Sequence, residues 1–248
     1  MTPMELRDLI GKHRGDPLEL LKGVGGFYHR PEHIEDAPLV GYAGTYSADG
    51  EEKHFVGFDY ANFARAESLP SVVLSWSRPL FKQLAVVQKE LGFRIDVFLG
   101  APEGGKSLAD KLAINLECRY VYPNVRKIAQ TVNQRPRKEF FWDRHYLAPG
   151  QHVVIVEDVA NNFSTTEQLV QLVLDANCIP AALVCILNRS PNIEKEFVVP
   201  PVTVPIISLE RKPMPEYRQD DPAVVKQVQA GNVVWKPKDE WHKLEPYL

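Results

Sequence analysis

The chain has 248 residues, and its 29 lysines and arginines are nearly balanced by 32 aspartates and glutamates, which leaves a formal net charge of −3. This balance argues against general nucleic-acid binding, because that function needs a strongly positive surface. The chain has no apolar run of the roughly 18 residues that a membrane span needs, and its charged beginning lacks the apolar stretch of a secretory signal. Its three cysteines are far apart and show no disulfide or metal-binding spacing, so we expect reduced thiols in a cytoplasmic protein.

The sequence pattern of residues 1–75 predicts a lobe that contains β-strands. Apolar residues at helical spacing predict a helix over 4–22. Two strands are expected at 40–46 and 54–60, on either side of a polar turn at 47–52. Glycines, turn residues and aromatics are frequent here, so we interpret this lobe as a folded hood and not as a linker.

Residues 76–210 predict an α/β core. Apolar strands alternate here with amphipathic helices, which is typical of a parallel sheet covered by helices on both faces. The expected elements are a helix at 75–92, a strand at 94–99, a helix at 107–116, strands at 118–122 and 152–157, a helix at 164–177 and a strand at 181–187. Ligands of such sheets bind beyond the carboxyl ends of the strands. The loops that leave those ends are 100–107, 124–151, 158–165 and 188–196.

The last stretch, residues 211–248, is rich in proline and carries several aromatic residues. We expect it to be an ordered extension of the fold or an arm that binds a partner. The sequence shows no internal repeat and no low-complexity segment that would indicate another architecture.

The first loop of the core spells GxxxxGKS from Gly100 to Ser107, the pattern of a P-loop that cradles nucleotide phosphates. It follows a strand and opens a helix, as a P-loop does. The later strand "VVIVED" resembles an apolar strand whose acid orders Mg²⁺. A P-loop NTPase that depends on Lys106 is therefore one hypothesis. Against it, 99 residues precede Gly100, whereas P-loop domains usually begin close to this loop.

The stretch "VVIVEDVANNFSTTEQ", residues 153–168, supplies a second anion site. Two acids, Glu157 and Asp158, end the strand, and a polar turn then opens a helix whose N-terminal N–H groups attract anions. The chain thus has two phosphate-binding turns on neighbouring strands, with an acid pair between them. That layout suits a substrate that carries a phosphate at one end and a diphosphate at the other.

This stretch resembles the signature of the type I phosphoribosyltransferases, most closely that of their orotate branch, and the resemblance extends over residues 50–210. It implies the type I phosphoribosyltransferase fold, in which helices flank a parallel sheet and an N-terminal lobe forms a hood. It also implies that Glu157 and Asp158 face the ribose hydroxyls of phosphoribosyl pyrophosphate and favour the positive charge that develops at the anomeric carbon. The residues expected at the 5′-phosphate are Asn161, Asn162, Ser164, Thr165 and Thr166.

Under the resemblance, the GxxxxGKS loop binds the pyrophosphate instead of a nucleotide. The residues assigned to the pyrophosphate are Glu103, Gly104, Gly105, Lys106, Arg126, Lys127 and Arg144. The basic stretch 135–151 corresponds to the mobile catalytic loop of the family, with Lys138 and His145 as catalytic residues. Closure of such a loop excludes water and neutralises the leaving group. Arg189 corresponds to the arginine that contacts the carboxylate of orotate in the orotate enzymes.

The phosphate turn departs from the family pattern, which has a glycine where this chain has Phe163. Glycine takes a positive φ at little cost, and Phe does not. We therefore expect the turn to be rebuilt around Asn161 and Asn162, because Asn tolerates left-handed geometry better than most residues. Asn161 also replaces the aspartate that orients the base in purine-specific relatives, which favours a pyrimidine.

The resemblance implies a Mg²⁺-dependent transfer of the phosphoribosyl group to a pyrimidine-type base, with orotate as the leading base, and release of pyrophosphate. Asp158 would act on the metal indirectly, through the ribose hydroxyls or water. A homodimer is implied as well, with neither nucleic acid nor membrane as a partner. The alternative is a phosphoribosyltransferase-like module that binds a nucleotide without catalysis, and Phe163 in the phosphate turn favours it.

Overall fold

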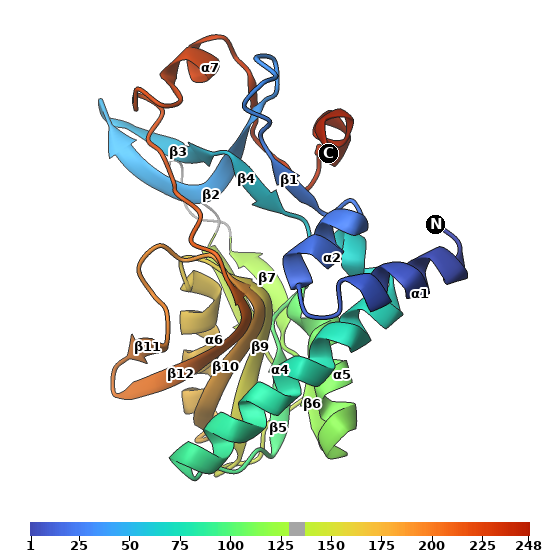
Figure 1. Ribbon diagram of the computed structural model, residues 1–248. Helices are drawn as coiled ribbons and strands as arrows, with labels where there is room; N and C mark the ends of the chain where they lie inside the picture. Colours follow the sequence, from blue (N-terminus) through green and yellow to red (C-terminus); the bar gives the residue numbers. More distant parts are fainter. Residues whose placement is uncertain (129–136) are drawn as a thin grey trace. The chain divides into compact units, whose positions relative to one another are not determined.

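The computed structural model of the chain describes the backbone of residues 1–128 and 137–248, and the side chains of residues 1–126 and 139–248. Figure 1 shows its helices and strands. In chain order they are α1 (Pro3–Lys12), α2 (Pro17–Gly23), β1 (Phe27–His29), β2 (Leu39–Ala48), β3 (Glu51–Gly57), β4 (Asp59–Ala61), α3 (Ala64–Glu67), α4 (Pro70–Leu91), β5 (Val97–Gly100), α5 (Gly105–Leu116), β6 (Arg119–Val121), β7 (Asn124–Ile128), β8 (Arg137–Phe141), β9 (His152–Ala160), α6 (Ser164–Asp175), β10 (Ile179–Asn188), β11 (Glu196–Val199), β12 (Val202–Arg211), α7 (Val225–Gln229), β13 (Val233–Val234) and the 3₁₀ turns η1 (Trp241–Lys243) and η2 (Glu245–Tyr247). The predicted α/β class is confirmed.

The described chain forms two compact units. One is Leu69–Lys212, and the other joins Met1–Ser68 to Pro213–Leu248. The C-terminal tail, which the sequence assigned as an extension at 211–248, therefore folds together with the N-terminal segment. The reason is a pairing of segments far apart in the chain, which leaves no local mark in the sequence.

The larger unit is built on a six-stranded sheet in the order β11-β12-β10-β9-β5-β6. From β12 to β6 all neighbours are parallel, and β11 pairs antiparallel with β12 at the edge. The central strands are buried nearly throughout, as is typical of a parallel sheet with both faces covered. The predicted parallel sheet is confirmed.

Helices cover both faces of this sheet: α4 and α5 pack together on one face, and α6 packs on the other (Figure 1). The buried residues of α6 are Thr166, Leu169, Val170 and Val173, which recur at helical spacing on one side of the helix. α4 ends where Gly92 takes a φ of 70°, the left-handed conformation that glycine favours at a helix C-terminus, and this is the residue at which the sequence predicted its end.

A β-hairpin lies within the long loop 124–151, where the sequence predicted no strand. β7 and β8 pair antiparallel, with Val125 opposite Phe140 and Arg126 opposite Glu139. Charged residues at successive positions of both strands obscure the alternating pattern that would have predicted them. The part of the predicted mobile loop at 135 and 136 lies outside the described residues.

The smaller unit holds the predicted strand pair, because β2 and β3 form a hairpin through Asp49 and Gly50, both at positive φ (55° and 78°). β13 of the tail adds to this hairpin, parallel to β2. Trp241 and Leu244 of the tail are buried in the same apolar cluster as Tyr28. The helix predicted over 4–22 is divided into α1 and α2, because Asp16 caps a new helix there and accepts a hydrogen bond from the N–H of Glu19 (2.9 Å).

Candidate functional site

The strand order of the large sheet marks one place for a ligand. Taken in chain order, its parallel strands are β5, β6, β9, β10 and β12, and in the sheet the first two have exchanged places. The direction of winding therefore reverses between β5 and β9. Open α/β sheets bind ligands in the crevice beyond the carboxyl ends of the two strands at such a switch point. Here those ends are Gly100 and Ala160.

The loop after β5, residues 101–104, is a tight turn that closes on itself. The N–H of Ala101 continues the sheet by donating to Val156 O (2.8 Å), and the N–H groups of Gly105 and Lys106 donate back to Ala101 O (2.9 Å) and Glu103 O (3.3 Å). A P-loop wraps a phosphate with such N–H groups, so their use inside this turn argues against the NTPase hypothesis. The N–H groups of Glu103 and Gly104 have no acceptor within the part of the chain that the structure describes.

The loop after β5 contacts the end of β9 directly because it is made of glycine. A Cβ on Gly104 would lie 2.1 Å from the Asp158 carboxylate, and one on Gly105 would lie 2.0 Å from the carbonyl oxygen of Val156. No side chain fits at either position without movement of its neighbours. Asp158 and the loop after β5 thus form one continuous surface at the switch point.

The two adjacent acids of β9, Glu157 and Asp158, lie on opposite faces of the sheet. Asp158 faces the loop after β5, whereas Glu157 lies opposite Cys185 of β10 and next to Thr166 of α6. Glu157 is only 6% exposed, and its Oε1 has no hydrogen-bond partner among the described residues. Burial, together with the negative charge of Asp158, raises the pKa of Glu157 to about 8, and the Thr166 hydroxyl acts in the opposite direction. The acids predicted to act as a pair therefore have different surroundings.

The turn after β9 differs from the expectation for Phe163. Phe163 itself takes the left-handed conformation (φ 60°, ψ 11°) as the N-cap of α6, and the turn is not rebuilt around the two asparagines. Its ring is 2% exposed and stacks on Phe197 of β11, with the centroids 4.8 Å apart. Burial of a large aromatic side chain offsets the cost of roughly 1–2 kcal/mol for left-handed backbone in an L-residue.

Asn162 and Ser164 complete this turn. The Oδ1 atom of Asn162 accepts hydrogen bonds from the N–H (3.2 Å) and the Oγ (3.0 Å) of Ser164. Thr165 and Thr166 follow in the first turn of α6, where backbone N–H groups have no partner within the helix. The predicted phosphate residues are therefore brought to one helix N-terminus, but Ser164 already has an acceptor.

The end of β10 lies beside the end of β9, since the N–H of Arg189 donates to Ala160 O (2.9 Å). The preceding residue, Asn188, is fully buried, and its amide donates to the carbonyls of Ile193 (3.0 Å) and Glu194 (3.2 Å). Asn188 was missed from the sequence, although a polar residue at the end of an apolar strand is a usable signal. It fixes the loop that carries Arg189.

The predicted cations of residues 124–151 lie on or near the separate β7–β8 sheet, and two of them have described partners. Arg126 forms an ion pair with Glu139 across the β7–β8 hairpin, and His145 packs edge-on against Tyr122 (4.5 Å between centroids). Arg144 is exposed. The two remaining cations, Lys127 and Lys138, face each other in the register of the hairpin, and their side chains lie outside the described residues.

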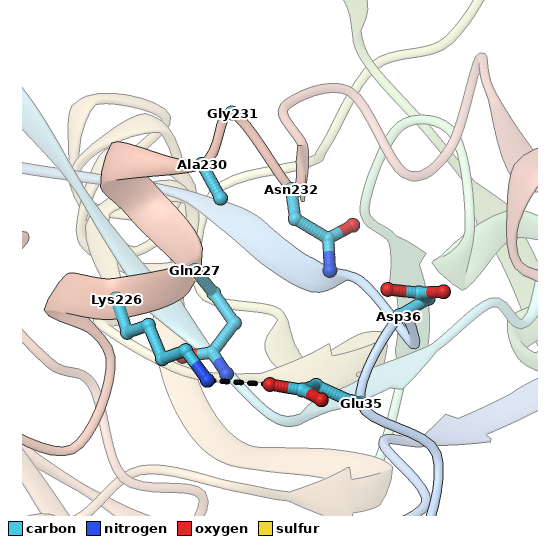
Figure 2. A pocket seen from close by; sticks show the side chains of 7 residues that line it. All are labelled: Glu35, Asp36, Lys226, Gln227, Ala230, Gly231 and Asn232. Atoms are coloured by element: carbon cyan, nitrogen blue, oxygen red, sulfur yellow. Dashed lines mark hydrogen bonds and ion pairs between the residues drawn. The ribbon is translucent and has the colours of Figure 1, made fainter.

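The smaller unit contains a charged hollow of about 450 Å³ (Figure 2). None of the predicted site residues lines it. It is lined by Glu35, Asp36, Lys226, Gln227, Ala230, Gly231 and Asn232. Glu35 and Lys226 form an ion pair with each other, and the Asn232 amide donates to Ala37 O (3.3 Å). The charges of Glu35 and Lys226 neutralise each other, and we assign no function to this hollow.

Over residues 1–128 and 137–248, no three His, Cys, Asp or Glu side chains gather closely enough to hold a metal ion by themselves. No helix of the described chain combines the length and apolar character needed to cross a membrane.

Comparison with known proteins gave solved structures but no sequence relatives. No protein-family model matches the chain, and no curated protein matches it. The chain is similar to orotate phosphoribosyltransferase from Aeropyrum pernix, with 16% identity and a TM-score of 0.49 over 78% of this chain and 92% of that one. It is similar to adenine phosphoribosyltransferase from Saccharomyces cerevisiae, with 14% identity and a TM-score of 0.44 over 67% and 93%.

A third similar structure is UMP synthase from Leishmania donovani, with 15% identity and a TM-score of 0.42. The match covers 71% of this chain and only 31% of that longer one. At such identities the likeness concerns the fold. Phosphoribosyltransferases, an orotate enzyme among them, are thus the kind of structure to which this chain is similar, as the motif at 153–168 predicted.

Proposed function

We propose that this chain is a type I phosphoribosyltransferase, which transfers the phosphoribosyl group of phosphoribosyl pyrophosphate to a nitrogenous base and releases pyrophosphate. One observation carries the proposal: Asp158 lies against the loop after β5 at the topological switch point, and the same strand, β9, continues into the helix-opening turn of α6. An acid therefore stands between two turns with N–H groups suited to anions.

In the proposed reaction, the bond from the anomeric carbon to the diphosphate oxygen breaks, and the diphosphate leaves with the electron pair. A nitrogen of the base supplies the pair for the new bond, and its proton passes to the leaving diphosphate or to water. Asp158 holds ribose hydroxyls and stabilises the positive charge that develops on the sugar. The N–H groups of Glu103 and Gly104 bind the diphosphate, and the first turn of α6, with Ser164 and Thr165, binds the 5′-phosphate.

A Mg²⁺ ion fits this arrangement only when it binds together with the diphosphate. Magnesium is commonly held by one or two carboxylates together with substrate phosphates and water. Asp158 is the carboxylate that would hold it, directly or through the ribose hydroxyls. When bound, the ion supplies positive charge that stabilises the leaving diphosphate. Glu157 is buried on the other face and does not share this role.

Orotate is the base that we propose, on the strength of Arg189. Its backbone is fixed beside the end of β9, so its loop borders the site. A guanidinium binds a carboxylate well, and orotate carries one where uracil does not. A cytoplasmic protein with no nucleic-acid or membrane partner is part of the same proposal, on the basis of the charge, the hydropathy and the cysteines of the sequence. The homodimer comes from the family resemblance alone.

The test is pyrophosphate release from phosphoribosyl pyrophosphate with Mg²⁺ and a panel of orotate, uracil, purine bases and nicotinate. We expect release with orotate, and loss of that release in Asp158→Asn. The variant Arg189→Leu should lose orotate turnover by a larger factor than it loses binding of phosphoribosyl pyrophosphate. Absence of release with every base would contradict the proposed reaction.

A second function, a nucleotide-binding module without catalysis, is favoured by the turn after β9. There Asn162 already occupies the N–H and hydroxyl of Ser164, which a 5′-phosphate would otherwise bind. Such a module would be stabilised by phosphoribosyl pyrophosphate without consuming it. A rise in melting temperature with no release of pyrophosphate from any base identifies this function.

A further inference from the structure

Lys106 is held between an acid and an aromatic ring at the start of α5. Its Nζ donates to Oε2 of Glu103 (2.6 Å) and lies over the ring of Tyr122, 4.6 Å from the centroid. The ammonium group therefore has one negatively charged partner and one π-face. With His145, which packs against Tyr122, these residues form the group called here the Lys106 cluster.

The aromatic side of the Lys106 cluster is firmly supported. Tyr122 contacts His145 edge-on (4.5 Å) and Tyr120 at a tilt (5.6 Å). The segment that carries His145 is tied to β6 and β7 on both sides of that residue. The Nδ2 of Asn124 donates to Asp143 (2.9 Å), and Arg119 donates to Tyr146 O (2.9 Å). Tyr122 therefore has a fixed position under Lys106.

The acidic side of the Lys106 cluster is loosely held. The Glu103 side chain is 71% exposed, whereas that of Lys106 is 24% exposed. An exposed ion pair contributes little to stability, because water solvates both charges when the pair separates. Glu103 can therefore turn into solvent, while Lys106 stays on Tyr122. The backbone N–H groups of Glu103 and Gly104, which have no acceptor in the described chain, lie next to this pair.

We propose that Glu103 is a removable counter-ion of Lys106, which a diphosphate displaces when it binds to the loop after β5, and that Tyr122 is the positioning residue that holds Lys106 for that exchange. This inference rests on the proposed function for the identity of the anion. The sequence assigned Glu103 to the pyrophosphate; here its backbone N–H keeps that role, and its side chain competes with the diphosphate. It also makes His145 a support of Tyr122 instead of a direct phosphate contact.

The test is calorimetric titration of inorganic pyrophosphate into the full chain and into four variants, with and without Mg²⁺. Glu103→Gln should tighten binding by about two- to fivefold, because the competing charge is gone. Lys106→Ala should weaken it by about tenfold or more, since a charge-assisted hydrogen bond is lost. Tyr122→Leu should weaken it by about two- to fivefold with the melting temperature within a few degrees of the wild type.

The matched control is Asp110→Asn. Asp110 pairs with Lys111 in the same helix at the same distance (2.6 Å), and the exposed fractions of these side chains are 44% and 26%. Its removal changes the net charge as Glu103→Gln does, and it should leave pyrophosphate affinity within twofold of the wild type. Equal tightening by both variants would mean a general charge effect and would overturn the inference. Unchanged or weaker binding in Glu103→Gln would overturn it too, as would no binding in any variant.

The outcome is separate from that of the proposed function. Phosphoribosyl transfer is measured on the same preparations. If no base consumes phosphoribosyl pyrophosphate while Glu103→Gln still tightens pyrophosphate binding, the proposed reaction is contradicted and the inference about Glu103 is supported. If transfer occurs and Glu103→Gln leaves pyrophosphate affinity unchanged, the proposed reaction is supported and the inference about Glu103 is contradicted.

Discussion

The turns after β5 and β9 both lead from a parallel strand into a helix at the switch point, yet they are built in opposite ways. The turn after β5 relies on missing side chains: Gly104 and Gly105 lie so close to β9 that a Cβ would overlap it. The turn after β9 relies on a large side chain: Phe163 is in left-handed conformation with its ring buried on Phe197.

The difference shows that a glycine is not required where a left-handed residue opens a helix after a parallel strand. Glycine makes left-handed backbone cheap and permits close approach. In Phe163 the burial of the ring offsets the cost of the left-handed backbone. Close approach to a neighbouring strand is not needed here, because the side chain leaves the turn on the core side. Each turn also has its own acid, Asp158 beside the glycines and Glu157 beneath the start of α6.

The largest expected effect is that of Phe163→Ala. The variant loses the buried ring and keeps the unfavourable φ, so the free energy of unfolding should fall by about 3–5 kcal/mol. Phe163→Gly loses the same ring but relieves the backbone, and it should be more stable than the Ala variant by about 1 kcal/mol. Urea unfolding followed by circular dichroism measures both. Equal stability of the Gly variant and the wild type would show that the ring anchors nothing.

Glu157 should make stability depend on pH. Its pKa is about 8 in the folded chain, above the ordinary value of 4.5, so the folded state keeps a proton that the unfolded state loses between these values. Stability should therefore fall as pH rises from 4.5 to 8, by at most about 1.4 kcal/mol per pH unit, and this contribution should be constant outside that window. The difference between wild type and Glu157→Gln isolates it. A difference that does not change from pH 5 to 8 contradicts the buried neutral acid.

In the turn after β5, substitution of Gly105 by Ala should lower the free energy of unfolding more than substitution of Gly104 does. In Gly105→Ala the new methyl group meets the backbone carbonyl of Val156, which cannot move aside, so a loss of about 1–3 kcal/mol is expected. In Gly104→Ala it meets the end of the Asp158 side chain, which can rotate. Gly11→Ala is the control, because nothing lies within 4 Å of its Cβ position. The comparison fails if Gly104→Ala proves the less stable variant.

Much of this architecture could be predicted from the sequence, because it depends on patterns among residues that are close together in the chain. The alternation of apolar strands with helices predicted the parallel sheet. The two turns at strand ends were predicted to lie on neighbouring strands, and β5 and β9 do pair. Gly92 marked the end of α4 correctly. These signals depend on residues a few positions apart, so neither the tertiary structure nor a comparison was needed to interpret them.

The features that escaped prediction depend on partners far away in the chain. Phe163 was expected to resist left-handed backbone, and only Phe197, 34 positions later, explains why it does not. The Glu157 and Asp158 pair was interpreted as one unit, because the predicted strand ended at Glu157 and left Asp158 in the loop. In the structure β9 continues to Ala160, so the two adjacent acids alternate between the faces of the sheet. The β7–β8 hairpin was hidden by charges such as Arg126 and Glu139, which pair only across the two strands.

The smallest expected effect comes from Asn162→Ala, and it bears most directly on whether the Phe163 turn binds a phosphate. The variant removes the acceptor of the Ser164 N–H and hydroxyl, which should cost about 1 kcal/mol of stability without ligand. A bound phosphate can replace that acceptor, so inorganic phosphate should raise the melting temperature of the variant more than that of the wild type. Asn115→Ala is the control, since it breaks a comparable hydrogen bond to Lys111 O (2.8 Å) in α5. If phosphate raises both variants equally, the turn after β9 does not bind it, and only the glycine turn remains as an anion site.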